Sequence, residues 1–388
     1  MNIDEFLKTA IERDASDLHM KAGNYPTIRV HGTLTPLTMY PRLTVEDTTQ
    51  LSGQILTDYQ KDQLQSDMDI DFAYSLPGFG RFRGNIFRQR GSLSIALRII
   101  PLEVKNIRQL LLPEVLEKIA LSPRGLVLVT GTTGSGKTTT LASMIDHINA
   151  ERRENIITVE DPIEYLHLDK KSTIHQREVG MDVQSFSRGL RACLREDPDV
   201  ILVGEMRDAD TIETALLAAE TGHLVLSTLH TLDAPESINR IISVFPPHHQ
   251  RQVRLQLASI LRAILSMRLI PRMDGEGRVP AVEVMIATPY IRECIHDRER
   301  THLIKDAISS GVSQYGMQTF DQSIYQLYRD GYISFEQGIK YSSTPDNFKL
   351  RVMGIQSTLD IALEEMESQM SQVERMEGGK EPPRKKPR

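Results

Sequence analysis

A glycine-rich loop at residues 131–138 carries the clearest chemical signal in this chain. Its sequence, Gly131-Thr-Thr-Gly-Ser-Gly-Lys-Thr138, satisfies the GxxxxGK(S/T) pattern of a P-loop. An apolar run at 126–130 enters the loop and a helical stretch at 139–148 leaves it, which is the context that the pattern requires. Such a loop turns its backbone N–H groups toward phosphate. We therefore expect a nucleotide to contact Gly131, Thr132, Thr133, Gly134, Ser135, Gly136, Lys137, Thr138 and Thr139.

The last two residues of this loop, together with a carboxylate further along the chain, indicate how the site would bind phosphate and metal. Lys137 can reach the β- and γ-phosphates, and the Thr138 hydroxyl suits Mg²⁺. A second apolar run, 200–203, ends in Gly204 and Glu205, at the strand edge where α/β sheets hold their ligands. Many P-loop proteins have Asp at the position of Gly204. We therefore expect Glu205 to hold Mg²⁺ through water, together with Thr138, so that the cofactors are ATP and Mg²⁺.

Three further clusters of polar residues could take part. The stretch 157–165 carries Glu160, Asp161 and Glu164, and carboxylates beside a triphosphate can bind metal or polarise water. A solvated loop remains the alternative. His223 and His230 stand at the two ends of an apolar run, with no spacing typical of a zinc site, and a structural role remains open for each.

Arginines are concentrated on two predicted strands near the N-terminus. Their guanidinium forks match phosphate geometry, although a solvated strand face would look the same in sequence. The residues are Arg81, Arg83, Arg88, Arg90 and Arg98.

Around these motifs, the apolar periodicity predicts two domains. A helix near 3–11 and alternating strands at 26–34, 70–74 and 93–99 indicate a small α+β domain with an antiparallel sheet. Short apolar runs that alternate with helices after residue 124 indicate a parallel sheet that is buried on both faces. We expect an N-terminal domain at 1–101, a linker at 102–123 that holds a helix at 113–120, and an ATPase domain at 124–356. The region 247–375 reads mostly helical, and 357–388 is expected to form a C-terminal helix with a disordered basic tail.

Composition excludes several classes of protein. The 388 residues include 46 Lys and Arg against 52 Asp and Glu, a net charge of −6, with no Trp and 5% aromatic residues. Proteins that coat nucleic acid are usually basic and use aromatic stacking platforms, so no nucleic-acid partner is expected. Two cysteines, Cys193 and Cys294, are too few for a tetracysteine zinc site. No apolar run approaches the roughly 18 residues of a membrane span. Because the N-terminus also lacks signal-peptide features, we expect a cytoplasmic protein.

The motifs, taken in order, resemble those of the secretion-superfamily ATPases of type II and type IV secretion and of type IV pili. The Asp box corresponds to 159–165, the Walker B motif to 200–205 and the His box to 221–230. The resemblance implies a PAS-like N-terminal domain, a RecA-like P-loop ATPase domain with a helical C-terminal part, and a ring of six subunits.

Within this superfamily, the chain is most similar to the pilus retraction ATPases of the PilT/PilU type. The similar segments are 15–19 (ASDLH), 80–84 (GRFRG), 176–180 (QREVG) and 316–322 (GMQTFDQ). The stretch 290–295 reads YIRECI where PilT-type proteins carry AIRNLI. This difference, the stretch 318–328 and the longer C-terminus favour the PilU-like branch.

The resemblance also implies roles for the candidate residues. Lys137 and Thr138 would contact the ATP phosphates and Mg²⁺, and Glu205 would be the Walker B acid. Glu164 would be the catalytic base, ahead of Glu160 and Asp161. His223 and His230 would link the nucleotide state to domain movement. Further donors to the phosphates would be Arg81, Arg83 and Arg98, with Arg207 as a weaker candidate.

The expected function is therefore a homohexameric motor at the inner-membrane base of a pilus machine, where it powers pilus retraction and twitching motility. Its partners would be an inner-membrane platform protein and possibly a second retraction ATPase. Pilus extension, type II secretion, or accessory action beside another motor remain alternatives. A nucleic-acid motor and a small-molecule kinase fit the residues less well. We expect the C-terminal segment to dock on a partner or a neighbouring subunit, with a frayed surface helix as the alternative.

Overall fold

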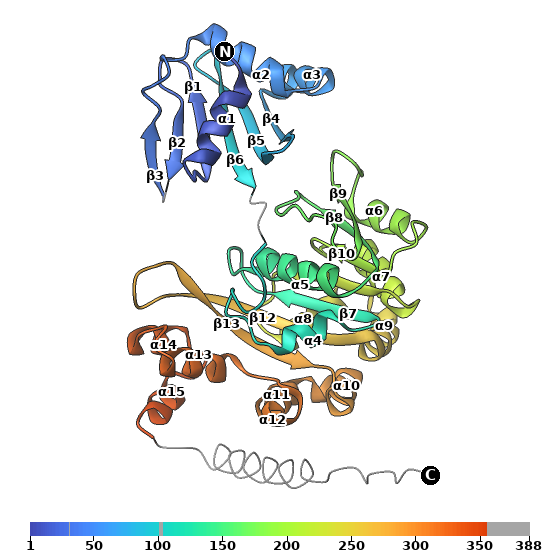
Figure 1. Ribbon diagram of the computed structural model, residues 1–388. Helices are drawn as coiled ribbons and strands as arrows, with labels where there is room; N and C mark the ends of the chain where they lie inside the picture. The colour runs from blue at the N-terminus through green and yellow to red at the C-terminus, as the bar shows by residue number, and fades with distance from the viewer. Residues whose placement is uncertain (31, 101–103, 355–388) are drawn as a thin grey trace, which may run out of the picture. The chain divides into compact units, whose positions relative to one another are not determined.

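The computed structural model describes residues 1–30, 32–100 and 104–354 (Figure 1). The chain divides into two compact units. In the described part of the chain, the first comprises Met1–Val104 with Pro162–Leu168, and the second comprises Lys105–Asp161 and residues 169–354.

The first unit is a six-stranded antiparallel sheet covered by three helices. Its strand order is β3-β2-β1-β6-β5-β4, and each neighbouring pair is antiparallel. Side chains from the helices and from alternate strand positions form one apolar core, as the period-2 pattern predicted. The elements are α1 (Ile3–Glu12), β1 (Asp17–Lys21), β2 (Thr27–Val30), β3 (Thr33–Pro36), α2 (Val45–Ile55), α3 (Asp58–Asp67), β4 (Asp69–Leu76), β5 (Gly80–Gln89) and β6 (Ser92–Ile100).

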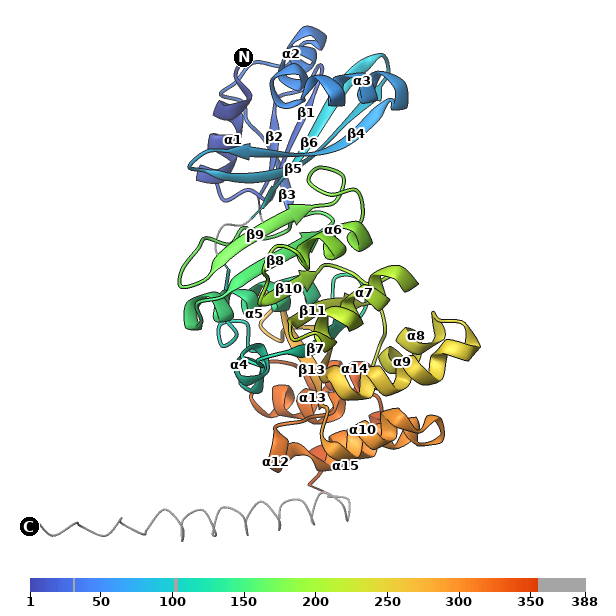
Figure 2. The ribbon, with the colours of Figure 1, turned by 90° about the vertical axis from the view of Figure 1, so that its right-hand side faces the viewer.

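The second unit is built on a seven-stranded sheet with the order β13-β12-β7-β11-β10-β8-β9. Figure 2 shows the part of this order that runs from β9 through β8, β10 and β11 to β7. All neighbouring pairs are parallel except β12 with β13. The bounds are α4 (Val115–Ala120), β7 (Gly125–Thr130), α5 (Lys137–Glu151), β8 (Asn155–Glu160), β9 (Thr173–Glu178), α6 (Phe186–Cys193), β10 (Val200–Val203), α7 (Ala209–Glu220), β11 (Leu224–Leu229), α8 (Ala234–Ser243), α9 (Pro247–Ile260), β12 (Leu261–Pro271) and β13 (Arg278–Ile286).

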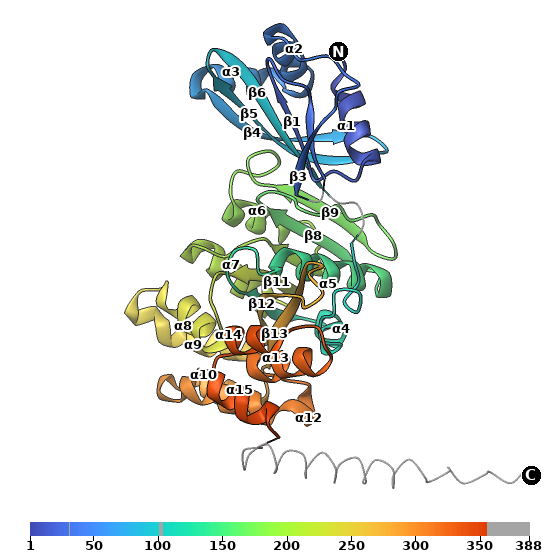
Figure 3. The same ribbon diagram turned by 90° about the vertical axis from the view of Figure 1, so that its left-hand side faces the viewer.

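Both faces of this sheet are buried. Leu126 and Leu128 of β7 pack in a cluster with α7, α8 and α9, whereas Val127 and Val129 pack in another with α4 and α5. Figure 3 shows these two helical layers on opposite sides of the strands. The continuous apolar runs therefore behave as predicted for a parallel sheet. The expected linker at 102–123 includes α4, which contributes buried core residues to this unit.

The prediction that 247–375 is mostly helical is wrong for 261–286. That stretch forms β12 and β13, which pair from Ala263 with Ile286 to Pro271 with Arg278 around a turn containing Gly275 and Gly277. A long apolar run is compatible with either a buried strand or a buried helix, so its periodicity could not decide between them. Helices resume with α10 (Pro289–His296), η1 (Arg298–Leu303), α11 (Ile304–Ser310), α12 (Val312–Tyr315), α13 (Phe320–Arg329), α14 (Phe335–Tyr341) and α15 (Pro345–Val352).

The predicted C-terminal helix and basic tail, 357–388, lie outside the described residues. Within the described ranges, no helix has the length and apolarity to cross a membrane.

Candidate nucleotide site

The P-loop connects β7 to α5 with the backbone conformation that its glycines permit. Gly131, Gly134 and Gly136 have φ of +139°, +75° and +98°, in the region that side chains rarely adopt. A Cβ at Gly131 would lie 2.6 Å from the Met267 carbonyl oxygen of β12. The loop is therefore closed against the neighbouring strand, and any larger residue at position 131 would displace it.

The donors of this loop fit a phosphate ligand. The Lys137 side chain is 8% exposed, and its Nζ donates to the carbonyl oxygens of Gly131 at 2.9 Å and Thr132 at 3.0 Å. No side chain caps the N-terminus of α5, and the buried Ser135 Oγ has no hydrogen-bond partner among the described residues. Uncapped helix N–H groups and an unpartnered hydroxyl are donors that a phosphate oxygen can satisfy.

Glu205 lies directly after β10, one strand beyond β11 from the P-loop strand. Its Oε1 accepts from Arg207 Nε at 2.7 Å and lies 3.2 Å from His230 Nε2. Burial of the carboxyl raises its pKa, but the hydrogen bond from Arg207 and the nearby charges of His230 and Arg207 prevail and lower it. The group is thus held as a carboxylate, the form that a divalent cation requires.

The Asp-box carboxylates differ in exposure. Glu160, at the end of β8, is 6% exposed, and its Oε1 accepts from Thr158 Oγ1 at 2.7 Å and Gln176 Nε2 at 3.1 Å. It therefore ties β8 to β9. Asp161 and Glu164 are exposed, so their carboxylates keep their acceptor capacity for solvent or substrate.

The two histidines of the His box lie at opposite edges of the sheet. His230 follows β11 and contacts Glu205. His223 precedes β11, and its Nδ1 lies 2.8 Å from the Ala218 carbonyl oxygen. The six residues of β11 separate the two histidines by about 20 Å along the strand, at the usual rise per strand residue. The structure therefore brings His230, and not His223, to the phosphate end of the sheet within one subunit.

Three arginines of the first unit, Arg81, Arg83 and Arg98, share one face of its sheet. Arg83 on β5 and Arg98 on β6 are direct cross-strand partners, and Arg81 lies two residues from Arg83. Phe82, between them, points to the core and is fully buried. Arg98 Nε donates to Asp17 Oδ1 at 3.0 Å, whereas the Arg83 side chain is exposed. This face therefore presents several guanidinium groups away from the apolar core.

Sequence reasoning missed two residues near the P-loop, both on β13. Arg278 Nη1 donates to the Gly134 carbonyl oxygen at 3.4 Å. The only feature of the sequence that points to Arg278 is its position directly after the glycine turn at 275–277. Glu283 is 4% exposed and stands within the otherwise apolar run 279–286 of β13, and a carboxylate in such a run is a signal in itself.

Glu283 joins the P-loop strand to the segment that follows His230. Thr130 Oγ1 donates to Ser266 Oγ at 3.1 Å, Ser266 Oγ donates to Glu283 Oε1 at 3.3 Å, and the Ala234 backbone N–H donates to the same oxygen at 3.0 Å. Burial raises the pKa of Glu283 to about 7, against the hydrogen bond from Ala234. The charged groups that interact electrostatically with the Glu283 carboxyl are Asp233, Lys305 and Arg268.

We expect Glu283→Gln to change how stability depends on pH. Because the folded-state pKa of about 7 exceeds the ordinary 4.5, the wild type loses stability as pH rises from about 4.5 through 7. The shift corresponds to about 3 kcal/mol at about 1.4 kcal/mol per unit. A neutral amide accepts the same hydrogen bonds without this loss. The free energy of unfolding of the variant, relative to wild type, should therefore increase by about that amount across this range.

Chemical denaturation at a series of pH values measures this difference. Glu293→Gln is the matched control, because Glu293 is exposed on α10. Parallel curves for the wild type and Glu283→Gln would contradict a buried, titrating carboxylate at this position.

Comparison with known proteins places these motifs in a family. A family model described as "Type II/IV secretion system protein" matches residues 1–328. The chain belongs to this family. It is 44% identical over 348 residues to the type IV pilus retraction ATPase PilT of Pseudomonas aeruginosa, covering 90% of this chain and all of the relative. It is 38% identical to the type IV pilus ATPase PilU of the same organism, covering 93% of this chain and 94% of the relative.

A solved structure supports the same assignment. The crystal structure of the pilus retraction motor PilT with bound ADP superposes with a TM-score of 0.82 at 46% identity, covering 89% of this chain and 98% of that one. The predicted architecture, an antiparallel-sheet domain followed by a parallel-sheet ATPase domain, is confirmed. The chain is 44% identical to PilT and 38% identical to PilU, so these identities give no specific support to the PilU-like branch that the sequence features favour.

Proposed function

We propose that this chain is an ATP hydrolase that powers retraction of type IV pili and twitching motility, working as a homohexamer. One observation carries the proposal. The P-loop, His230 and Glu205 follow the carboxyl ends of the neighbouring parallel strands β7, β11 and β10, and His230 contacts Glu205. The chain also spans the whole length of a relative that is a pilus retraction ATPase.

The local chemistry supports phosphoryl transfer to water. The P-loop N–H groups and Lys137 would bind the phosphates of ATP, and Thr138 and Glu205 would hold Mg²⁺, which when bound offsets the phosphate charge. Exposed Glu164 would accept a proton from the attacking water. His230 and Arg207 keep the Glu205 carboxylate ionised and oriented.

The remaining candidates have roles that depend on assembly. The arginine face of the first unit (Arg81, Arg83 and Arg98) would supply donors to the developing phosphate charge, so that domain position controls turnover. His223, at the far end of β11, would act by transmitting strand or helix movement and not by touching the nucleotide.

The proposed partners follow from the proposed function. They are an inner-membrane platform protein at the base of the pilus machine, where the hexamer would act from the cytoplasmic side, and a second retraction ATPase. The second candidate function is an accessory role beside such a motor.

Deletion of the gene tests the direction of movement. Cells without a retraction motor should carry excess surface pili and lose twitching. Bald cells would instead indicate an extension motor and would refute the proposal. The accessory function predicts a different result. The purified chain would hydrolyse ATP, but expressing its gene in the deletion strain would restore twitching only when a second ATPase is also present.

A further inference from the structure

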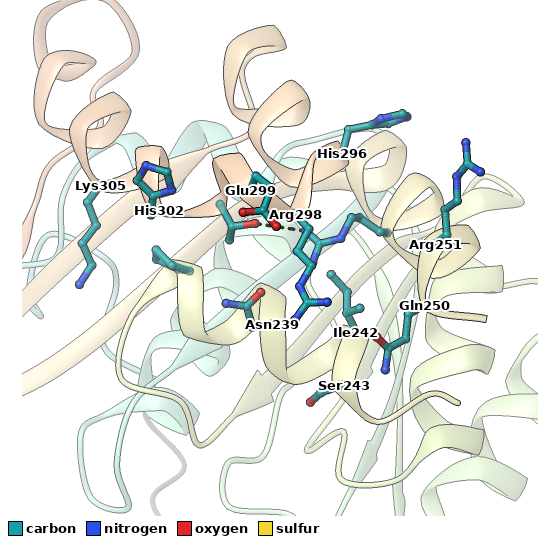
Figure 4. Close-up of a pocket in the computed structure, with 13 residues that line it drawn as sticks. Asn239, Ile242, Ser243, Gln250, Arg251, His296, Arg298, Glu299, His302 and Lys305 are labelled. Atoms are coloured by element: carbon teal, nitrogen blue, oxygen red, sulfur yellow. Dashed lines mark hydrogen bonds between the residues drawn. The ribbon is translucent and has the colours of Figure 1, made fainter. Parts of the chain in front are cut away.

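A strongly basic pocket lies on the second unit, away from the P-loop strand. It has a volume of about 990 Å³ and is walled by α8, α9 and η1 (Figure 4). Its cationic side chains are Arg251, Arg254, Arg298 and Lys305, with His296 and His302 at its rim. Among the described residues that line it, Glu299 is the only carboxylate. The pocket therefore presents a positive surface to whatever enters it.

The fold compensates only part of the charge in this pocket: Lys305 Nζ lies 2.9 Å from Asp233 Oδ2. Arg254 is 8% exposed, and its Nη1 donates to the Ile295 carbonyl oxygen at 2.8 Å and to Thr301 Oγ1 at 3.2 Å. Burial lowers the pKa of Arg254 and the charge of Arg298 lowers it further, while the charge of Asp297 acts in the opposite direction without reversing the shift. Arg251 and Arg298 have no ion-pair partner within the described part of the chain. An anionic ligand would relieve this repulsion.

The lining of the pocket favours an acidic peptide over a nucleotide. Its described lining contains no Phe, Tyr or Trp ring that could stack on a base. Its cations come from three elements, α9 with Arg251 and Arg254, η1 with Arg298 and α11 with Lys305. Carboxylates spaced along a peptide can therefore reach several of them at once. Its apolar side chains, Pro235 and Ile242, suit aliphatic neighbours of those carboxylates.

The chain itself contains such a peptide. Residues 357–378 hold six acidic side chains against one basic side chain, Arg375, for a net charge of 1 − 6 = −5. Leu359, Leu363 and Met366 are interspersed among them. The acidic residues are Asp360, Glu364, Glu365, Glu367, Glu374 and Glu377.

The last described helix delivers the chain close to the pocket. Leu350 and Arg351 of α15 line a neighbouring pocket, and Lys305 lines both pockets. From Gly354 to Asp360 an extended chain can span about 20 Å. We propose that the acidic segment 357–378 docks in the basic pocket of its own chain, with its carboxylates paired to Arg251, Arg254 and Arg298.

A fluorescent label on the segment tests this docking in the full-length protein. Because Cys193 and Cys294 are both buried, a thiol-directed label is placed in the segment through a Ser371→Cys variant. We expect the anisotropy of the label to be high in the otherwise unchanged chain. It should fall toward that of a free peptide in the Arg251→Glu/Arg298→Glu background. Arg240→Glu is the matched control, because Arg240 is exposed on α8 but does not line the pocket.

A charge swap separates docking from a general loss of structure. Glu364→Arg/Glu365→Arg should free the label by itself, and combining it with Arg251→Glu/Arg298→Glu should restore the high anisotropy. Equal anisotropy in all variants would overturn the proposal. So would loss of anisotropy when labelled chains are mixed with an excess of unlabelled Arg251→Glu/Arg298→Glu chains, because the segment would then occupy a second copy.

Discussion

Replacing Lys137 by alanine should lower ATP turnover by about 100-fold or more. The ammonium group is held at the mouth of the P-loop by the Gly131 and Thr132 carbonyl oxygens, where it would meet the phosphate charge of ATP. Removing a preorganised charge at that position costs binding and transition-state stabilisation together. Release of inorganic phosphate from ATP, without any added acceptor, measures the effect.

Lys118→Ala provides a control for the loss of a lysine charge, since Lys118 is exposed on α4. Turnover of Lys137→Ala within a few-fold of wild type would show that the P-loop is not the catalytic phosphate site. The assay without acceptor also tests the kinase alternative, because a kinase would release little phosphate.

The second large effect is expected at the arginine face of the first unit. In related phosphoryl transfers, an arginine at the developing charge contributes about 10³–10⁵ in rate. We expect Arg83→Ala or Arg98→Ala to lower kcat by about 100-fold or more while nucleotide affinity falls less and oligomers persist. The comparison of kcat with KM, together with gel filtration, separates this outcome from misfolding.

Arg88→Ala is the matched control for this face. Arg88 is exposed on the same strand, β5, but its register places it on the opposite face from Arg83. If the Arg81/Arg83/Arg98 triple variant kept wild-type turnover, these arginines would be a solvated strand face and the proposed coupling of domain position to hydrolysis would be wrong.

The parts of the fold that sequence could predict are those with local signals. The P-loop combines glycines, an apolar strand and a helix within about 25 residues, and the turn geometry that these residues impose is what the structure shows. The runs at 200–203 and 224–226 were predictable as buried strands for the same reason, because short apolar segments bounded by polar residues have few alternatives.

The rest depends on contacts between distant residues. The apolar pattern of 261–286 does not distinguish strand from helix. The pairing of β12 with β13 across the 275–277 turn decides their conformation. Glu283 gains its burial and its partners from Ser266 and Ala234, which are 17 and 49 residues away. His223 and His230 look equivalent in sequence, yet the direction of β11 places only His230 beside Glu205.

The most direct test of the central claim is to express the Glu205→Gln chain in the deletion strain. The amide is isosteric but neutral, so ATP binding should persist while hydrolysis slows. If hydrolysis at this site powers retraction, these cells should remain hyperpiliated and fail to twitch, whereas the wild-type chain restores both properties. Recovery of twitching by Glu205→Gln, with wild-type amounts of protein, would contradict the account.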